Sequence, residues 1–349
     1  MGKIDYRYNY VRDKIADFIV EFDIKKLPVE PLKIINKKKW TLRTYEFYAR
    51  KHKIKIKDII EAYESEDAFT IYKKGLYSIS YNDKIRSNGR IRFTLMHEIG
   101  HIYLKHLEEF NHTILSRGGL NKREYEMLEK EANIFASEIL SPYSVLLTLK
   151  WTNYELIKKH CGLSTHAAKT RASQLFDLRM NKVYIDENSI IYQNFFDFIN
   201  QKCCPICGYG FISKEAVYCP ICGNKLKWGE GEMKYKDGYQ LDKNGRAIIC
   251  PKCGNDEISP DALYCRICGT YLINKCADDW HYDKMRDYSD FRESCNTIAA
   301  GNARYCEKCG NRTTFFINGL LCDWEELEVT NAKKQIAAGK EDKNYEVPF

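Results

Sequence analysis

The residues with the clearest chemical meaning in this 349-residue chain are two histidines four positions apart, His97 and His101. On a helix, residues i and i+4 lie on the same face, so both imidazoles can bind one metal ion. Glu98 follows the first histidine and can reach a metal-bound water as a general base. This arrangement is typical of zinc centres that hydrolyse peptide bonds.

The sequence around the two histidines favours a buried helix. Outside the motif, residues 92–104 carry a single charge, Arg92, and no proline. A metal site in a low-dielectric cleft requires this, because unpaired charges beside it would be costly to bury. Gly100 costs roughly 1 kcal/mol relative to alanine inside a helix. We interpret it as a sign that another element packs closely against this helix.

A catalytic zinc site needs a third protein ligand and an open position for water. A histidine ten residues after the first would supply the ligand, but that position is Leu107, and His106 lies one residue too early. A second predicted helix, residues 129–140, offers carboxylates instead. Glu131 lies at the edge of its apolar stripe and can face the same cleft, and periodicity alone also allows Glu124 and Glu138.

The same helix has small side chains that favour close helix packing. Its apolar stripe consists of Leu128, Ala132, Phe135, Ala136 and Ile139. The two alanines are four positions apart and would let this helix lie close to the helix of the two histidines. A glutamate from a second helix is the arrangement of the gluzincin peptidases.

Cysteine spacing gives the second strong signal. Fourteen of the fifteen cysteines follow residue 202, and most form Cys-x-x-Cys-Gly knuckles with eleven residues between the members of each pair. Two such knuckles supply four thiolates for a closed tetrahedral zinc site. We therefore predict two structural zinc ribbons, the first with Cys204, Cys207, Cys219 and Cys222, the second with Cys250, Cys253, Cys265 and Cys268. Cys204 is preferred to Cys203 because it precedes proline with the same two-residue gap as Cys250.

A third ribbon is predicted with less regular spacing. Its ligands would be Cys276, Cys295, Cys306 and Cys309, with an insertion from Asp278 to Arg292 between the first two. His281 inside that insertion is an alternative ligand. The competing interpretation is a ribbon that has lost its zinc and is held together by packing.

Two runs of residues in the first half of the chain resemble a known family. The run from Arg92 to His101, and the later run from Glu131 through Ala136 to Leu140-x-Pro142, resemble the ImmA/IrrE metallo-endopeptidases. The step at residues 27–29 and the stretch 77–82 resemble the amino-terminal half of that family, so the resemblance covers about residues 5–178. It implies His97, His101 and Glu131 as zinc ligands and Glu98 as catalytic base. It also implies a cytoplasmic protease that cleaves helix-turn-helix repressors.

The expected fold class is α+β. We predict a mainly helical zincin-like peptidase domain with a small β-sheet at 1–200, followed by small β-rich zinc ribbons at 201–228, 246–273 and 274–317 and a tail at 318–349, frayed from residue 331. Within the first domain we expect an amphipathic helix at 5–22, a hairpin at 69–81, a helix-turn-helix-like segment at 153–177 and a short strand at 182–186. Ser164 is the expected cap of the last helix of that segment.

Composition limits the remaining possibilities. No signal peptide and no apolar run near 18 residues is visible, so we expect a soluble cytoplasmic protein with no membrane partner. The formal net charge of +7 permits an acidic partner without arguing for one. The expected cofactors are one catalytic and two to three structural zinc ions, and the expected partner is a protein substrate.

Two other functions remain open. The ribbons and the helix-turn-helix-like segment, with Lys169 and Arg171, could recognise nucleic acid or a protein while the peptidase is vestigial. Alternatively the ribbons could sense redox or zinc status and gate the protease. For the oxyanion of a hydrolytic reaction, Tyr103 and His106 are the candidate donors.

Overall fold

The computed structural model of the chain describes residues 2–109, 122–283 and 287–326. It divides into two compact units, Met1–Ile199 and Asn200–Phe349. The first is mainly helical with one small sheet, and the second consists of short strands and loops around the clustered cysteines. The predicted α+β class is confirmed.

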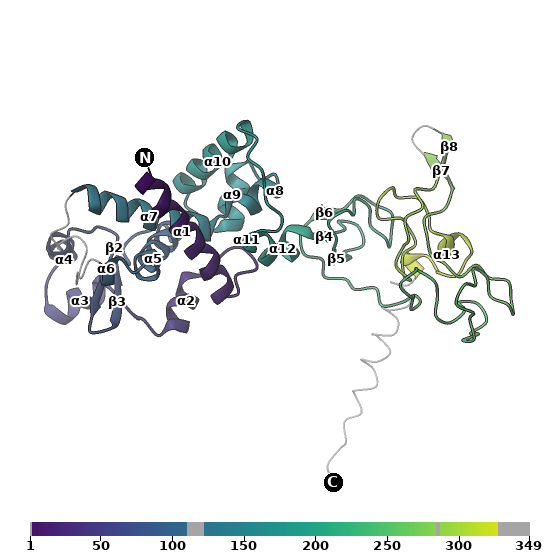
Figure 1. Cartoon of the computed structure of the whole chain (residues 1–349), viewed down its shortest axis with the longest axis horizontal. Coiled ribbons are helices and arrows are strands. Elements are labelled where there is room, and N and C mark those ends of the chain that lie inside the picture. Colours follow the sequence, from purple (N-terminus) through teal and green to yellow (C-terminus); the bar gives the residue numbers. More distant parts are fainter. Residues whose placement is uncertain (1, 110–121, 284–286, 327–349) are drawn as a thin grey trace, which may run out of the picture. The chain divides into compact units, whose positions relative to one another are not determined.

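Two long helices form the centre of the first unit (Figure 1). Helix α5 (Asn88–Tyr103) carries the two histidines, and α7 (Lys122–Leu140) packs along it. The apolar stripe predicted for α7 is fully buried. Helix α1 (Gly2–Glu21) packs against α7 and buries Val11, Ile15, Phe18 and Ile19, as its periodicity predicts.

A three-stranded sheet lies beside α5. The predicted hairpin is present as β2 (Ala68–Lys73) and β3 (Leu76–Tyr81), joined by a turn at Lys74 and Gly75. Strand β1 (Thr41–Thr44) pairs in parallel with β3, so the strand order is β1-β3-β2 and β2 is an edge strand. No pattern in the sequence predicted β1.

The other helices of the first unit are short except α10. They are α2 (Pro31–Lys38), α3 (Tyr45–His52), α4 (Ile56–Tyr63), α6 (His106–Glu109), α8 (Tyr143–Thr148), α9 (Tyr154–Cys161), α10 (Thr165–Met180), α11 (Ile190–Asn194) and α12 (Phe196–Asn200). Ser164 caps α10 as predicted, since its hydroxyl accepts a bond from the Ala167 N–H. The strand expected at 182–186 is wrong: these residues form a turn and an extended segment without a strand partner in the described structure.

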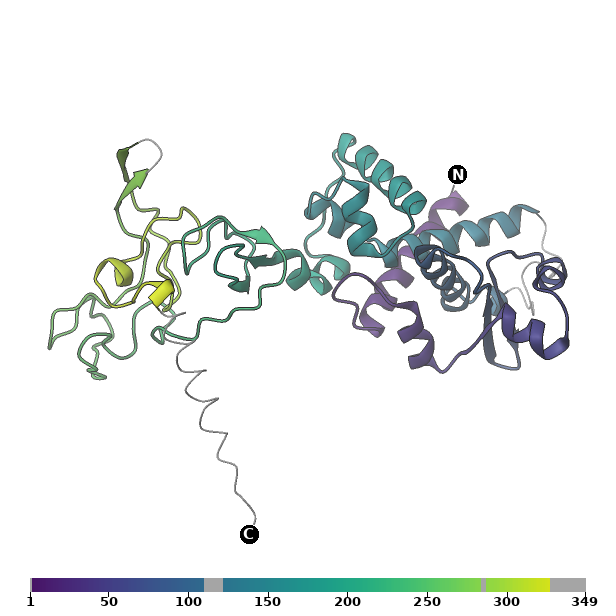
Figure 2. The same cartoon turned by 180° about the vertical axis from the view of Figure 1, so that it is seen from behind.

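Among the described residues of the second unit, the strands pair into two small sheets, and Figure 2 shows this unit from behind. Strands β4 (Gln201–Cys203), β5 (Gly210–Ile212) and β6 (Lys227–Trp228) pair in the order β5-β4-β6. The expected insertion is a hairpin of β7 (Asp279–Asp283) and β8 (Tyr288–Arg292), followed later by α13 (Thr314–Ile317). His281 lies on β7, and the cysteine group found there consists of Cys276, Cys295, Cys306 and Cys309.

Packing continues beyond residue 317, because Leu321 is buried with Ala247 and Phe315. The expected frayed end at 331–349 lies outside the described residues. Within the part of the chain that the structure describes, no helix has both the length and the apolar character needed to cross a bilayer.

Candidate metal centre and active site

Helix α5 positions the histidines at its carboxyl-terminal end, and its close approach to α7 depends on Gly100. The helix starts at Ser87, whose hydroxyl accepts a bond from the Arg90 N–H at 3.3 Å. A Cβ placed on Gly100 would lie 3.2 Å from Phe135 Cδ1 and 3.4 Å from the Cα of Ala132. The crowding expected from this glycine is therefore present, and it comes from the predicted small residue of α7.

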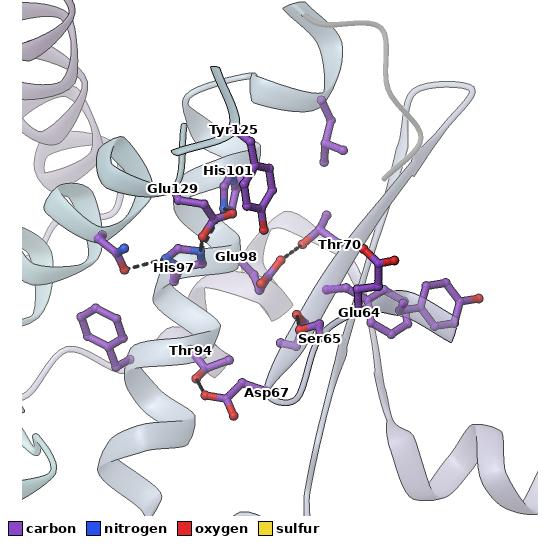
Figure 3. Close-up of a pocket in the computed structure, with 16 residues that line it drawn as sticks. Glu64, Ser65, Asp67, Thr70, Thr94, His97, Glu98, His101, Tyr125 and Glu129 are labelled. Carbon is purple, nitrogen blue, oxygen red and sulfur yellow. Dashed lines mark hydrogen bonds and ion pairs between the residues drawn. The ribbon is translucent and has the colours of Figure 1, made fainter. Parts of the chain in front are cut away.

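Three side chains converge on one point beside these helices (Figure 3). The Nε2 atoms of His97 and His101 lie 2.9 Å apart. The carboxylate of Glu129 lies 3.2 Å from the first and 3.4 Å from the second. In a tetrahedral zinc site with bonds of about 2.0–2.1 Å, ligand atoms are about 3.3 Å apart. Two imidazoles and a carboxylate at these separations fit a zinc ion.

The structure corrects the expected third carboxylate from Glu131 to Glu129. Neighbouring residues on a helix differ in direction by about 100°, so positions two apart differ by about 200°. Glu131 points away from the pair and is buried against Arg7 of α1, with 2.6 Å between the Arg7 Nε and the carboxylate. Of the alternatives, Glu138 pairs with Arg171, and Glu124 is not part of the described group.

A polar stripe on α7 marked the correct face. Tyr125, Glu129 and Asn133 are four residues apart in turn, and all three line the cleft. The pattern of apolar positions alone does not distinguish this stripe from Glu131, since both border the buried residues. The spacing of these three polar side chains is the signal that could have identified Glu129.

The Nδ1 atoms of His97 and His101 also have hydrogen-bond partners. Asn133 Oδ1 lies 3.0 Å from His97 Nδ1, and His106 Nδ1 lies 2.9 Å from His101 Nδ1. His106 Nε2 in turn lies 3.1 Å from the Glu131 carboxylate. Since Glu131 accepts a proton from His106 Nε2, His106 Nδ1 must accept one from His101. Both ligand histidines therefore present an unprotonated Nε2 to the metal position.

The charges at this centre suit metal binding. Burial would raise the pKa of Glu129, but the neighbouring imidazoles of His101 and His97 hold that pKa well below its ordinary value. Burial lowers the pKa of His101. Burial also opposes charge on His97, yet its bond to Glu129 and the nearby Glu98 raise its pKa. An ionised, partly buried carboxylate facing two imidazole nitrogens forms a site that a bound cation would stabilise.

Glu98 is placed to act as a base in a cleft of about 280 Å³. It is buried, and its Oε2 accepts a bond of 2.6 Å from the Thr70 hydroxyl of β2. Figure 3 shows this bond across the cleft from Glu129. The edge strand β2 thus holds the catalytic candidate in position and forms one wall of the cleft through Ala68, Phe69 and Thr70.

The two expected oxyanion donors do not line the cleft. Tyr103 donates its hydroxyl to Glu21 at 2.9 Å, and His106 is fully buried between His101 and Glu131. Tyr125, which sequence reasoning missed, does line the cleft. Burial and the neighbouring Glu129 raise the pKa of Tyr125 to about 12, so its hydroxyl stays protonated and can donate.

All three predicted cysteine groups are brought together. In each ribbon the first and fourth sulfurs lie 3.4–3.5 Å apart, and the second and third lie 3.5–3.6 Å apart. Thiolates around zinc at about 2.3 Å are about 3.8 Å apart, so these groups fit a tetrahedral ion closely. The third group uses Cys276 and Cys295 despite the hairpin between them.

The helix-turn-helix-like segment does not offer the expected DNA-contacting pair. Arg171 is buried, where its guanidinium donates to the Ser141 carbonyl at 2.9 Å and pairs with Glu138. Lys169 lies over the ring of Tyr154. Cys161 is buried, and burial raises the pKa of its thiol to about 12.

Comparison with known proteins agrees with the geometry of the first unit. The candidate centre lies on two packed helices beside a small sheet. Residues 49–173 match the family model Peptidase_M78, the IrrE N-terminal-like domain. The matched range contains the whole candidate centre, whereas the cysteine groups lie outside it. No curated protein matches the chain.

Proposed function

We propose that the first unit is a zinc-dependent endopeptidase. The observation that carries this proposal is the convergence of His97, His101 and Glu129 beside the buried Glu98. Zinc, when bound there, would polarise a substrate carbonyl and lower the pKa of a bound water. The match to the IrrE N-terminal-like domain supports the same chemistry.

The residues of the cleft have separate roles in this proposal. Glu98 takes a proton from the attacking water and returns it to the leaving amine. Thr70 occupies Oε2 of Glu98 and so leaves Oε1 for that water. The Tyr125 hydroxyl donates to the carbonyl oxygen as negative charge develops on it.

The edge of β2 that has no strand partner among the described residues would bind the substrate in an extended conformation. Backbone pairing to an edge strand positions a scissile bond regardless of its side chains. We infer a protein substrate, and the family resemblance favours a helix-turn-helix repressor. The cysteine ribbons would then dock the substrate or a partner. Their thiols must stay reduced to bind zinc, which suits the cytoplasm.

The test is cleavage of candidate repressors encoded near the gene by the purified, zinc-loaded chain. Cleavage that stops on addition of a chelator and resumes with zinc is the expected result. Binding of a repressor or of nucleic acid without cleavage, at full zinc occupancy, would instead favour a regulator with a vestigial peptidase. A steep salt dependence would identify nucleic acid as its ligand.

A further inference from the structure

The second knuckles of ribbons 1 and 3 pair with each other reciprocally within the second unit. The carbonyl of Glu307 accepts bonds from the N–H groups of Val217 and Tyr218, at 2.8 and 2.9 Å. The carbonyl of Pro220 accepts bonds from Arg304 and Tyr305, at 2.8 and 3.0 Å. Each carbonyl occupies the same position in its own Tyr-Cys-x-x-Cys-Gly knuckle, one residue after the first cysteine.

The side chains follow the same two-fold relation. A Cβ on Gly223 would lie 2.8 Å from the Tyr305 ring, and one on Gly310 would lie 3.0 Å from the Tyr218 ring. Each tyrosine therefore covers the glycine of the other knuckle. One ion pair crosses the contact, Lys308 with Glu215 at 2.8 Å. A face that pairs reciprocally with its own kind is self-complementary, as in isologous dimers.

Ribbon 2 has the same knuckle, Tyr264–Gly269, with the same internal bonds. The Cys265 N–H donates to Thr270 and the Gly269 N–H to Cys265, both at 2.8 Å, as their counterparts do in ribbons 1 and 3. Its face is nevertheless exposed. Ile267 is 67% exposed, whereas the equivalent Ile221 is 0% exposed.

The groups used for pairing in ribbons 1 and 3 are unused here. Tyr264 is 59% exposed, and no described atom lies within 4 Å of a Cβ on Gly269. Among the described residues, the N–H groups of Leu263 and Tyr264 and the carbonyl of Arg266 have no backbone hydrogen-bond partner. The face is largely apolar, and its one cation, Arg266, is paired with Glu257. This chemistry does not suit a polyanion.

We propose that the second knuckle of ribbon 2 binds the same knuckle of a second copy of this chain. The Arg266 carbonyl of each copy accepts bonds from the Leu263 and Tyr264 N–H groups of the other, and each Tyr264 ring covers the opposite Gly269. Two short knuckles bury less than a standard interface, so the dimer is weak, with a Kd on the order of micromolar or above.

The test measures the mass of the full, zinc-loaded chain by sedimentation equilibrium over roughly 1–300 µM, a range that spans such a Kd. Two substitutions at one exposed position provide opposite expectations. Ile267 is equivalent to Lys308, and Asp261 is equivalent to the Glu215 that Lys308 pairs with. Ile267→Asp should raise the dimer Kd at least tenfold, because it faces Asp261 of the other copy. Ile267→Lys should leave the Kd unchanged or lower it.

Ile206→Asp is the matched control, because Ile206 is 60% exposed on the first knuckle of ribbon 1. It should leave the Kd unchanged, and zinc content should be equal in all variants. A wild-type chain that is monomeric throughout the range would overturn the proposal, as would a dimer that Ile267→Asp does not weaken. If the aspartate disturbs zinc binding, the lysine variant decides, since ribbon 3 carries lysine there: loss of its dimer would overturn the pairing.

Discussion

At the scale of single residues, the centre depends on contacts that fix the orientation of its ligands. Asn133 and His106 occupy the Nδ1 atoms of the two histidines, so both Nε2 atoms face the metal position. This series of side-chain contacts continues from His106 to Glu131 and from Glu131 to Arg7. Glu131 thus holds His106 in place and is not one of the candidate metal ligands.

Replacing Glu98 with glutamine tests its role as the base. Glu98→Gln preserves the shape of the side chain and the bond from Thr70, but it cannot accept a proton. We expect unchanged zinc content and a loss of cleavage of about 10²–10⁴-fold. Zinc analysis and a cleavage assay on the same preparation measure both. Normal turnover in this variant would refute the mechanism.

Variants of Glu129 and Glu131 distinguish the roles of these two residues of α7. Glu129→Ala should lose the zinc of the centre, because it removes a ligand. Glu131→Ala should retain that zinc but lower the free energy of unfolding by about 1–3 kcal/mol, since it removes the carboxylate that pairs with buried His106 and with Arg7. Zinc content and chemical denaturation measure these effects. Zinc loss in the Glu131 variant alone would restore the original expectation.

His106 should tune the metal affinity without binding the metal. His106→Phe removes the acceptor for the His101 Nδ1 proton while filling much of the same buried volume. A roughly 10–100-fold weaker zinc affinity is expected. Competition with a chelator of known affinity measures it, and an unchanged affinity would exclude a positioning role.

At the scale of elements, the centre depends on how closely α5 and α7 approach. Gly100→Ala adds a Cβ at 3.2–3.4 Å from its neighbours, but it also gains helix propensity, so its net effect should be small. Gly100→Val adds branches that must displace Ala132 or Phe135, at a cost of about 1–3 kcal/mol in stability. Thermal unfolding of the two variants tests this, and a valine variant as stable as the alanine one would contradict it.

Local patterns predicted the elements that local interactions determine. The helices α5 and α7 follow from periodicity, and the hairpin of β2 and β3 follows from alternation around Lys74-Gly75. Strand β1 has four residues and depends on a parallel, non-local pairing with β3, which no local pattern encodes. Residues 182–186 have strand-like composition but no partner strand in the described structure.

The sequence likewise predicted those parts of the sites that depend on local spacing. His97, Glu98 and His101 share one helix, so their spacing alone brings them together. The third carboxylate depends on how α7 is rotated against α5, and Glu129 and Glu131 both border its buried stripe. The cysteine groups were predictable because each knuckle is local and the repeat supplies its partner.

At the scale of the whole molecule, the two units differ in what stabilises them. The first buries apolar side chains from most of its helices, whereas the buried clusters of the second include ribbon cysteines such as Cys204, Cys219 and Cys250. The free energy of metal binding to such sites contributes directly to the free energy of folding. Chelation should therefore unfold the second unit and leave the helices of the first largely intact. Limited proteolysis with and without chelator, alongside far-UV circular dichroism, measures this, and a second unit that resists protease without zinc would contradict it.

The most direct measurement is an anomalous difference map, recorded at the zinc absorption edge from crystals of the zinc-loaded chain. The account predicts a peak bonded to His97 Nε2, His101 Nε2 and the carboxylate of Glu129, at about 2.0–2.2 Å. A peak coordinated by Glu131, or full occupancy of the cysteine groups with no peak between the two histidines, would contradict it.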